Sequence, residues 1–120
     1  MFLSLGHTKL DVFGVIHDLI KECYNLTGRF PHEERYNLTQ QIKRAALSVK
    51  LNLAEGASRK SPVERKRFYE IARGSVIELD AAIGVAIQLE YLPLREVQKI
   101  GLLIVRCYSM LTKMTGKSEN

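Results

Sequence analysis

The sequence predicts an all-α protein, an antiparallel up-down bundle of four helices that assembles as a homo-oligomer. Apolar residues recur at helical spacing almost throughout, and no segment alternates with period two for long enough to make a strand. The connections between the expected helices are short, which makes consecutive helices antiparallel neighbours. Two helices also carry more apolar surface than one bundle core buries, which favours contacts between copies.

Composition places the chain among single-domain proteins. It has 120 residues, of which 46% are apolar, so residues 1–120 can form one core without disulfides. The longest apolar run, residues 100–105, is far shorter than the roughly 20 residues of a membrane span. The short apolar start lacks a basic region, so we expect no signal peptide and a cytoplasmic protein. The two cysteines, Cys23 and Cys107, exclude a disulfide scaffold; free thiols are expected, and a single buried bridge stays open.

The first two helices are expected over residues 9–26 and 32–57. Thr8 is the candidate N-cap of the first helix, and the segment from Gly28 to Pro31 is expected to end that helix. Pro31 suits the first turn of the second helix, and Gly56 is expected to end that helix. The core stripe of the second helix follows a helical period: Leu38, Ile42, Ala45, Ala46, Val49 and Leu53.

The last two helices are expected over residues 62–92 and 94–114. Ser61-Pro62-Val63-Glu64 is a strong start signal, since serine caps, proline fits the first helical position and glutamate completes a capping box. Pro93 is expected to stop the third helix. Its predicted core stripe is Phe68, Ala72, Ser75, Leu79, Ala82, Ala86 and Leu89, and that of the fourth is Val97, Ile100, Ile104, Cys107, Leu111 and Met114.

A second apolar stripe on the third helix predicts an interface between copies. The stripe lies off the core stripe, and its residues recur at alternating spacings of four and three: Arg73, Ile77, Asp80, Gly84, Ile87 and Tyr91. Val76 lies beside them. The second helix has a similar excess in Leu47, Leu51 and Ala54. The predicted interface residues are Leu47, Leu51, Ile77, Gly84, Ile87 and Tyr91. The alternative is that long helices hide these side chains within one bundle.

The positive charge is concentrated in one quarter of the chain. The net charge is +5, and residues 43–73 hold nine basic and three acidic residues. Such a cluster, with a basic loop leading into a helix N-terminus, is typical of a surface that binds phosphates. The predicted nucleic-acid-binding residues are Lys43, Arg44, Lys50, Arg59, Lys60, Arg65, Lys66, Arg67 and Arg73. The alternative is a solvated helix face followed by a basic loop.

A polar stripe separates the two apolar stripes of the second helix. It consists of Arg44, Ser48, Asn52, Glu55 and Arg59. Polar groups beside buried surface need partners, so we predict a structural polar network of Ser48, Asn52, Glu55 and Glu78. An anion-binding strip is the alternative for this stripe.

Signals for catalysis and metal binding are missing from the sequence. The three histidines are not at metal-ligand spacing, and neither a phosphate loop nor a nucleophile motif occurs. Helical carboxylates such as Glu55 and Glu78 serve more often in ion pairs than in catalysis. We therefore expect no enzyme activity, no cofactor and no metal.

Several blocks of the chain together resemble one known family. They include Gln41-Ile42-Lys43-Arg44-Ala45-Ala46, Asn52-Leu53-Ala54-Glu55-Gly56 and Ile71-Ala72-Arg73-Gly74-Ser75, and the family's motif positions fall on Arg44, Ser48, Asn52, Glu55, Gly56, Arg59, Arg73, Ser75 and Glu78. The pattern resembles the bacterial four-helix-bundle proteins encoded within 23S rRNA intervening sequences. One departure is Val49-Lys50, where many relatives carry Ile-Pro, so the shape of the second helix is expected to differ.

The resemblance implies properties that spacing does not show. Members of the family look like pentameric barrels with a basic surface, and no catalytic residues are known for them. They are similar to the accessory variability proteins of diversity-generating retroelements, which bind nucleic acid and a reverse transcriptase. The expected function is thus that of a non-enzymatic, homo-oligomeric protein that binds RNA or DNA, with no membrane partner. The alternative is an oligomeric scaffold or accessory factor for a reverse transcriptase or another protein.

Overall fold

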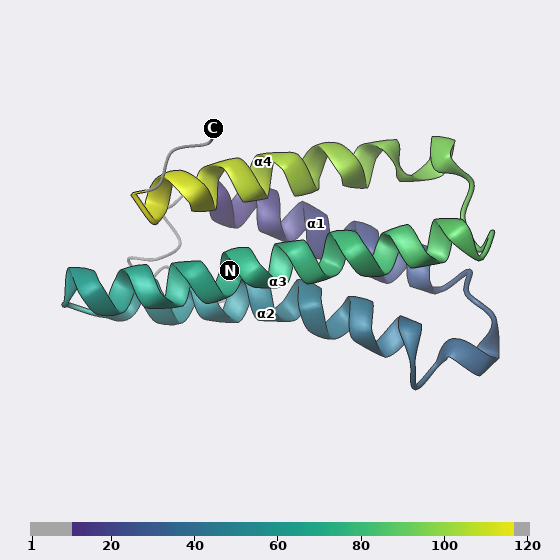
Figure 1. Cartoon of the computed structure of the whole chain (residues 1–120), viewed down its shortest axis with the longest axis horizontal. Helices are drawn as coiled ribbons and strands as arrows, with labels where there is room; N and C mark the ends of the chain where they lie inside the picture. Colours follow the sequence, from purple (N-terminus) through teal and green to yellow (C-terminus); the bar gives the residue numbers. More distant parts are fainter. Residues whose placement is uncertain (1–10, 117–120) are drawn as a thin grey trace.

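A computed structural model describes residues 11–116 of the chain (Figure 1). The elements are α1 (Asp11–Thr27), the 3₁₀ turn η2 (His32–Glu34), α2 (Leu38–Ser58), α3 (Pro62–Gln88), the 3₁₀ turn η3 (Leu94–Val97) and α4 (Gln98–Met114). The described residues contain no strand, so the predicted all-α class is confirmed. None of the helices in this range is both long and apolar enough to cross a membrane.

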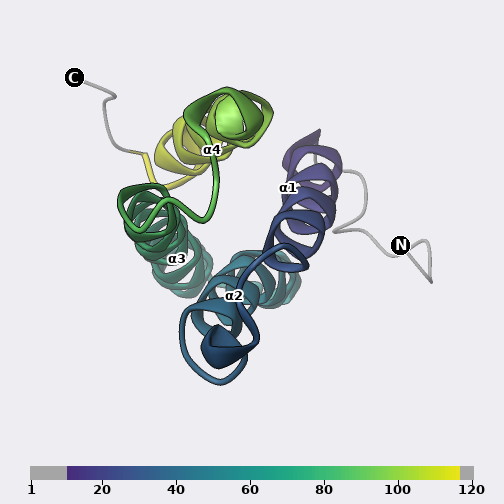
Figure 2. The same cartoon turned by 90° about the vertical axis from the view of Figure 1, so that its right-hand side faces the viewer.

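The four helices form an antiparallel bundle in which each helix has two neighbours. Viewed end-on, α2 and α4 lie diagonally opposite each other, with α1 and α3 between them (Figure 2). The contact between α2 and α3 is the most extensive. The predicted up-down four-helix arrangement is therefore present in a single copy of the chain.

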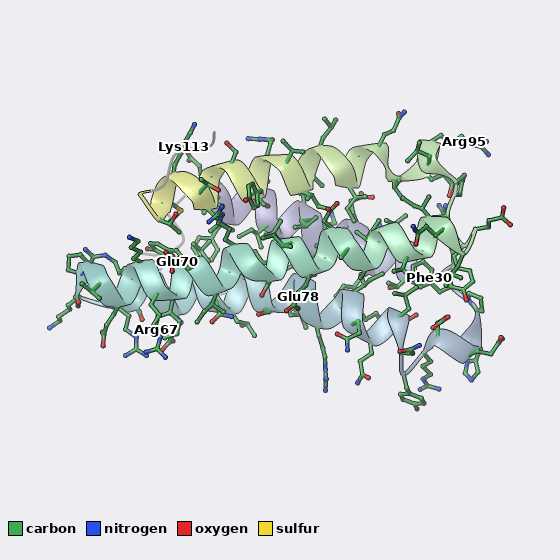
Figure 3. The ribbon with its side chains drawn as sticks, in the orientation of Figure 1. Phe30, Arg67, Glu70, Glu78, Arg95 and Lys113 are labelled. Atoms are coloured by element: carbon green, nitrogen blue, oxygen red, sulfur yellow. The ribbon has the colours of Figure 1, made fainter. Side chains whose placement is uncertain are left out.

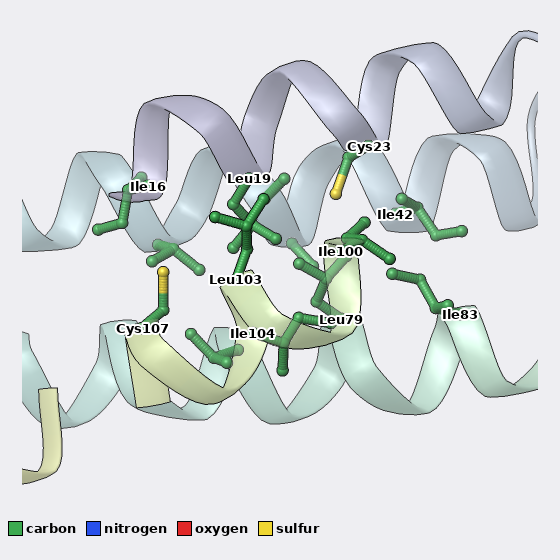
Figure 4. Close-up of a cluster of buried hydrophobic side chains, with 14 of the residues drawn as sticks. Ile16, Leu19, Cys23, Ile42, Leu79, Ile83, Ile100, Leu103, Ile104 and Cys107 are labelled. Atoms are coloured by element: carbon green, nitrogen blue, oxygen red, sulfur yellow. The ribbon is translucent and has the colours of Figure 1, made fainter. Parts of the chain in front are cut away.

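The core contains side chains from all four helices. Ile16, Leu53, Leu79 and Leu111 are fully buried, one from each helix. All six residues of the predicted α2 stripe are buried, as predicted, and Figure 4 shows part of this apolar cluster. Burial of such side chains is the main source of stability in a bundle of this size.

Several helix boundaries differ from the sequence prediction. The second helix begins at Leu38 rather than at residue 32, because the segment after Pro31 forms the turn η2. The carboxylate of Glu34 then accepts hydrogen bonds from the Leu38 amide (3.4 Å) and the Asn37 side chain (3.3 Å). The helix continues past Gly56 to Ser58. The predicted cap Thr8 lies outside the described residues.

The third helix ends at Gln88 rather than at residue 92. Glu90 has a φ of 63°, and the Tyr91 amide donates to the Ala86 carbonyl at 2.9 Å, which closes the helix end as a left-handed cap. The fourth helix begins at Gln98 instead of residue 94, because residues 94–97 form the turn η3.

The burial of several α3 side chains differs from the sequence prediction. Leu89, predicted in the core, is half exposed because it lies beyond the last helical residue. Val76, predicted outside the core, is buried. Ile87 and Tyr91, predicted to be exposed in a monomer, are partly buried against the core. Phe68 is half-buried rather than central.

Candidate nucleic-acid interface

A close approach between two helices forms the basic end of the bundle. A Cβ atom at Gly56 on α2 would lie 2.8 Å from the Cβ of Phe68 and 2.9 Å from Cε1 of Tyr69, both on α3. Real side chains do not tolerate such distances, so glycine is required here. This contact fixes the start of α3 directly beside the end of α2.

Ser61 defines the first turn of α3. Its side chain accepts a hydrogen bond from the Glu64 amide at 3.4 Å, and Pro62 occupies the first helical position. The predicted N-cap is thus confirmed. The cap stabilises the first turn of α3, so the backbone on either side of it, which includes Lys60, Lys66 and Arg67, is ordered.

Two of the predicted nucleic-acid contacts instead hold the connection between α2 and α3. The Arg65 guanidinium donates to the carbonyl of Arg59 at 2.9 Å and to that of Lys60 at 2.8 Å. Arg59 forms an ion pair with Glu55, and its guanidinium stacks over the Phe68 ring at 5.0 Å. Arg59 and Arg65 therefore order the loop, and they keep positive charge beside it.

Three exposed cations remain at this end of the bundle. Lys60 lies in the connection, and Lys66 and Arg67 lie in the first two turns of α3. Among the described residues, no hydrogen bond or ion pair engages their charged groups. Figure 3 shows Arg67 extending away from the ribbon at the α2–α3 end. Cations on an ordered surface with free donors are suited to phosphate oxygens.

The other four predicted contacts lie elsewhere on the molecule. Arg73 points toward α4, where it stacks over Tyr108 at 4.8 Å and donates to its hydroxyl at 2.7 Å. Lys43 lies over the ring of Tyr24 on α1, at 4.8 Å. Arg44 is exposed on α2, and Lys50 is half-buried there. The nine cations thus do not form one continuous surface.

A polar network joins α2 to α3 next to the basic end. The Ser75 hydroxyl donates to the Ser48 hydroxyl at 2.8 Å, and the Asn52 side chain donates to the same hydroxyl at 3.0 Å. Glu55 binds Arg59 rather than these residues. Glu78 is exposed, and no hydrogen bond connects it to the network in the described range; it borders a shallow groove with Leu38, Gln41, Ala81, Ala82 and Val85.

At the opposite end of the bundle, acidic side chains engage some of the neighbouring cations and one tyrosine. Arg29 forms an ion pair with Glu96, and the hydroxyl of Tyr91 donates to Glu34 at 2.7 Å. Glu22 likewise accepts from Lys99 at 3.0 Å. At the α2–α3 end, by contrast, Lys60, Lys66 and Arg67 have no ion-pair partner among the described residues.

The groups available for chemistry are few. Burial raises the pKa of both Cys23 and Cys107 to about 12, so both thiols stay protonated and unreactive near neutral pH. Within residues 11–116, no group of three or more histidine, cysteine or acidic side chains could hold a metal ion.

Comparison with known proteins identifies the family of the chain and a solved structure with a similar four-helix fold. The model of the 23S rRNA-intervening sequence protein family matches residues 8–113, nearly the whole chain. The chain belongs to this family. A solved structure of similar fold is a protein of unknown function from the S23 ribosomal protein family of Bacteroides thetaiotaomicron, with 18% sequence identity and a TM-score of 0.79. The alignment covers 87% of this chain and 97% of that one. No protein of curated function matches the chain.

The sequence did not show which cations of this family member form hydrogen bonds or ion pairs within the chain and which remain unpaired. Arg73 and Tyr108 are 35 residues apart, and Arg29 and Glu96 are 67 apart. Neither pair has a local spacing signal. Only the Glu55–Arg59 pair, at four residues, was visible from the sequence.

Proposed function

We propose that this member of the 23S rRNA-intervening sequence protein family is a non-enzymatic, homo-oligomeric protein that binds the backbone of RNA or DNA with its α2–α3 end. The observation that carries the proposal is the set of exposed, unpaired cations, Lys60, Lys66 and Arg67, on a connection ordered by Arg65 and Ser61. Contacts of this kind give affinity for phosphates with little reading of base sequence.

Self-association is part of the proposal because one copy leaves large apolar side chains in solvent. Leu51, Ile77 and Val105 are 65%, 53% and 66% exposed. Exposed apolar surface on this scale is typical of an interface. A pentameric barrel, which the family resemblance implies, would bring several basic ends together and raise the affinity for a long phosphate backbone through multivalency.

The test is a triple variant, Lys60→Ala, Lys66→Ala and Arg67→Ala, measured by fluorescence anisotropy with structured RNA and with duplex DNA. Arg59 and Arg65 are left in place because they hold the loop. The matched control is Lys21→Ala, Arg35→Ala and Arg95→Ala, which removes the same charge away from the α2–α3 end. The proposal predicts a large loss of affinity for the first triple only. An equal loss of affinity in both triple variants would mean that binding depends on net charge and not on a particular site.

The second candidate is an oligomeric scaffold or accessory factor, for a reverse transcriptase or another protein. The groove between α2 and α3, bordered by Leu38 and Val85, favours it because a partner helix could bury the exposed Val85 side chain. Binding of both nucleic acids that is absent, or that disappears near physiological salt, would favour this second candidate.

A further inference from the structure

The surface between α3 and α4 is hollowed by two adjoining cavities of about 460 and 270 Å³. Both are bordered by Asp80 and Ile104, so they form one groove along the two helices. Ile77, Val105 and Tyr108 line the first cavity, on one side of Asp80. Nothing from the described part of the chain fills this groove.

Glycines widen the second cavity. Gly84 on α3 and Gly101 on α4 both line it, and a Cβ atom at either position would meet no other atom within 4 Å. Glycine weakens a helix interior relative to alanine. No contact within one copy requires either glycine, so the space they leave is suited to a group from outside.

A ridge on α2 has the shape and composition to enter this groove. Arg44, Leu47, Leu51, Ala54 and Ser58 follow one another at spacings of three and four residues and form one stripe off the core stripe of α2, with Ala54 partly packed against the core. Leu47 is 38% exposed and Leu51 is 65% exposed. The ridge and the groove lie on different sides of the bundle, since α2 is diagonal to α4 (Figure 2).

The charges on the two surfaces are complementary. Asp80 is exposed in the middle of the groove, and Arg44 is exposed at one end of the ridge. Among the described residues, neither side chain has an ion-pair partner. An apolar groove with one free carboxylate therefore matches an apolar ridge with one free guanidinium on the same chain.

We infer that the α2 ridge of one copy of this chain docks in the α3–α4 groove of the next copy, with Arg44 against Asp80. Each copy then contributes two different surfaces, so the contact is heterologous and either closes into a ring or continues as a filament. The inference rests on the self-association part of the proposed function and does not need nucleic acid. It assigns Arg44 to the contact between copies rather than to nucleic acid.

Cysteine cross-linking tests this pairing directly. In the variant Leu47→Cys/Val105→Cys, a short bismaleimide should join one copy's ridge to the next copy's groove and give a ladder of dimers, trimers and larger species. The native cysteines are buried and do not compete. Each single variant should stay uncross-linked, because like surfaces do not meet. Tyr36→Cys/Val63→Cys, two exposed positions outside both surfaces, is the matched control.

Specific outcomes overturn the inference. Dimers from Val105→Cys alone would show that grooves face each other in a symmetric contact. A double variant that labels fully and stays monomeric would show that the groove serves another partner. Since no nucleic acid is present, the ladder can form even if RNA and DNA binding fails, and the Lys60/Lys66/Arg67 triple variant should leave it intact.

A charge exchange gives an independent check that does not depend on cross-linking. Arg44→Asp and Asp80→Arg alone should each weaken association by about tenfold or more, measured by analytical ultracentrifugation. The double variant Arg44→Asp/Asp80→Arg should recover most of that loss, because it restores opposite charges across the contact. Circular dichroism would verify that each variant keeps its helix content. No recovery in the folded double variant would contradict the Arg44–Asp80 pairing.

Discussion

The hydroxyl of Ser75 on α3 donates a 2.8 Å hydrogen bond to the hydroxyl of Ser48 on α2. Asn52 donates to the same oxygen at 3.0 Å, so Ser48 is the shared acceptor of a small network between the two helices. Asn52 lies one helical turn before Gly56, where α2 packs closely against Phe68 and Tyr69 of α3. Together these contacts give the basic connection a rigid base.

Removal of the shared acceptor should loosen this base. Ser48→Ala leaves the donors of Ser75 and Asn52 without it, and we expect the free energy of unfolding to fall by about 1 kcal/mol. Ser58→Ala is the control, since its exposed hydroxyl bonds only to the nearby Glu55 carbonyl. Urea denaturation followed by circular dichroism measures both. Equal stability of the two variants would show that the network contributes nothing.

The close approach at Gly56 predicts opposite effects for two glycine substitutions. Gly56→Ala forces a methyl group against Phe68 and should lower the free energy of unfolding by about 1–3 kcal/mol. Gly74→Ala, in the middle of α3 with open space around its Cβ position, should raise it by up to about 1 kcal/mol. Thermal unfolding of both variants checks the sign. A Gly56→Ala protein as stable as the native chain would contradict the packing described here.

The cysteines predict a decline in stability at alkaline pH. Burial raises the pKa of Cys23 and Cys107 from 9.0 to about 12 in the folded chain. Because the folded pKa is the higher one, this contribution to stability is complete below pH 9 and is lost as the pH rises toward 12. Cys23→Ala/Cys107→Ala should therefore lose less stability than the native chain over that range, measured by urea denaturation at successive pH values.

The rate of thiol alkylation at pH 8 tests directly whether the two native cysteines are buried. Iodoacetamide should modify the native cysteines only as fast as the chain unfolds, whereas the exposed thiol of Val63→Cys, outside both proposed contact surfaces, should react at the rate of a free peptide. Rapid alkylation of Cys23 or Cys107 in the folded protein would mean that the core is open at these positions.

Helical periodicity predicted the fold class and the core face of α2, because one stripe of apolar side chains decides which side of a helix is buried. It failed at the ends of elements. The left-handed Glu90 ends α3 four residues early, and η2 and η3 replace the expected first turns of two helices. Such turns depend on tertiary contacts, for example that between Tyr91 and Glu34, which local propensity does not encode.

The candidate site could be predicted in part. Counting charges located the basic segment, and the capping signal at Ser61 located the start of α3. The sequence did not reveal which cations the fold itself uses. Arg65 holds two carbonyls and Arg73 holds Tyr108, and both contacts depend on the geometry of packed helices. That division narrows the predicted surface to Lys60, Lys66 and Arg67.

The most direct test of the central claim is fluorescence anisotropy of the native chain with structured RNA and with duplex DNA, each over a range of salt concentrations. We predict binding at moderate salt, with log K falling linearly with log salt. The Lys60/Lys66/Arg67 triple alanine variant should lower the magnitude of the slope on duplex DNA by about 2.7, since each phosphate contact contributes about 0.9. The charge-matched control should keep the native slope. Binding that is absent near physiological salt, or a slope that the triple variant leaves unchanged, would contradict the account.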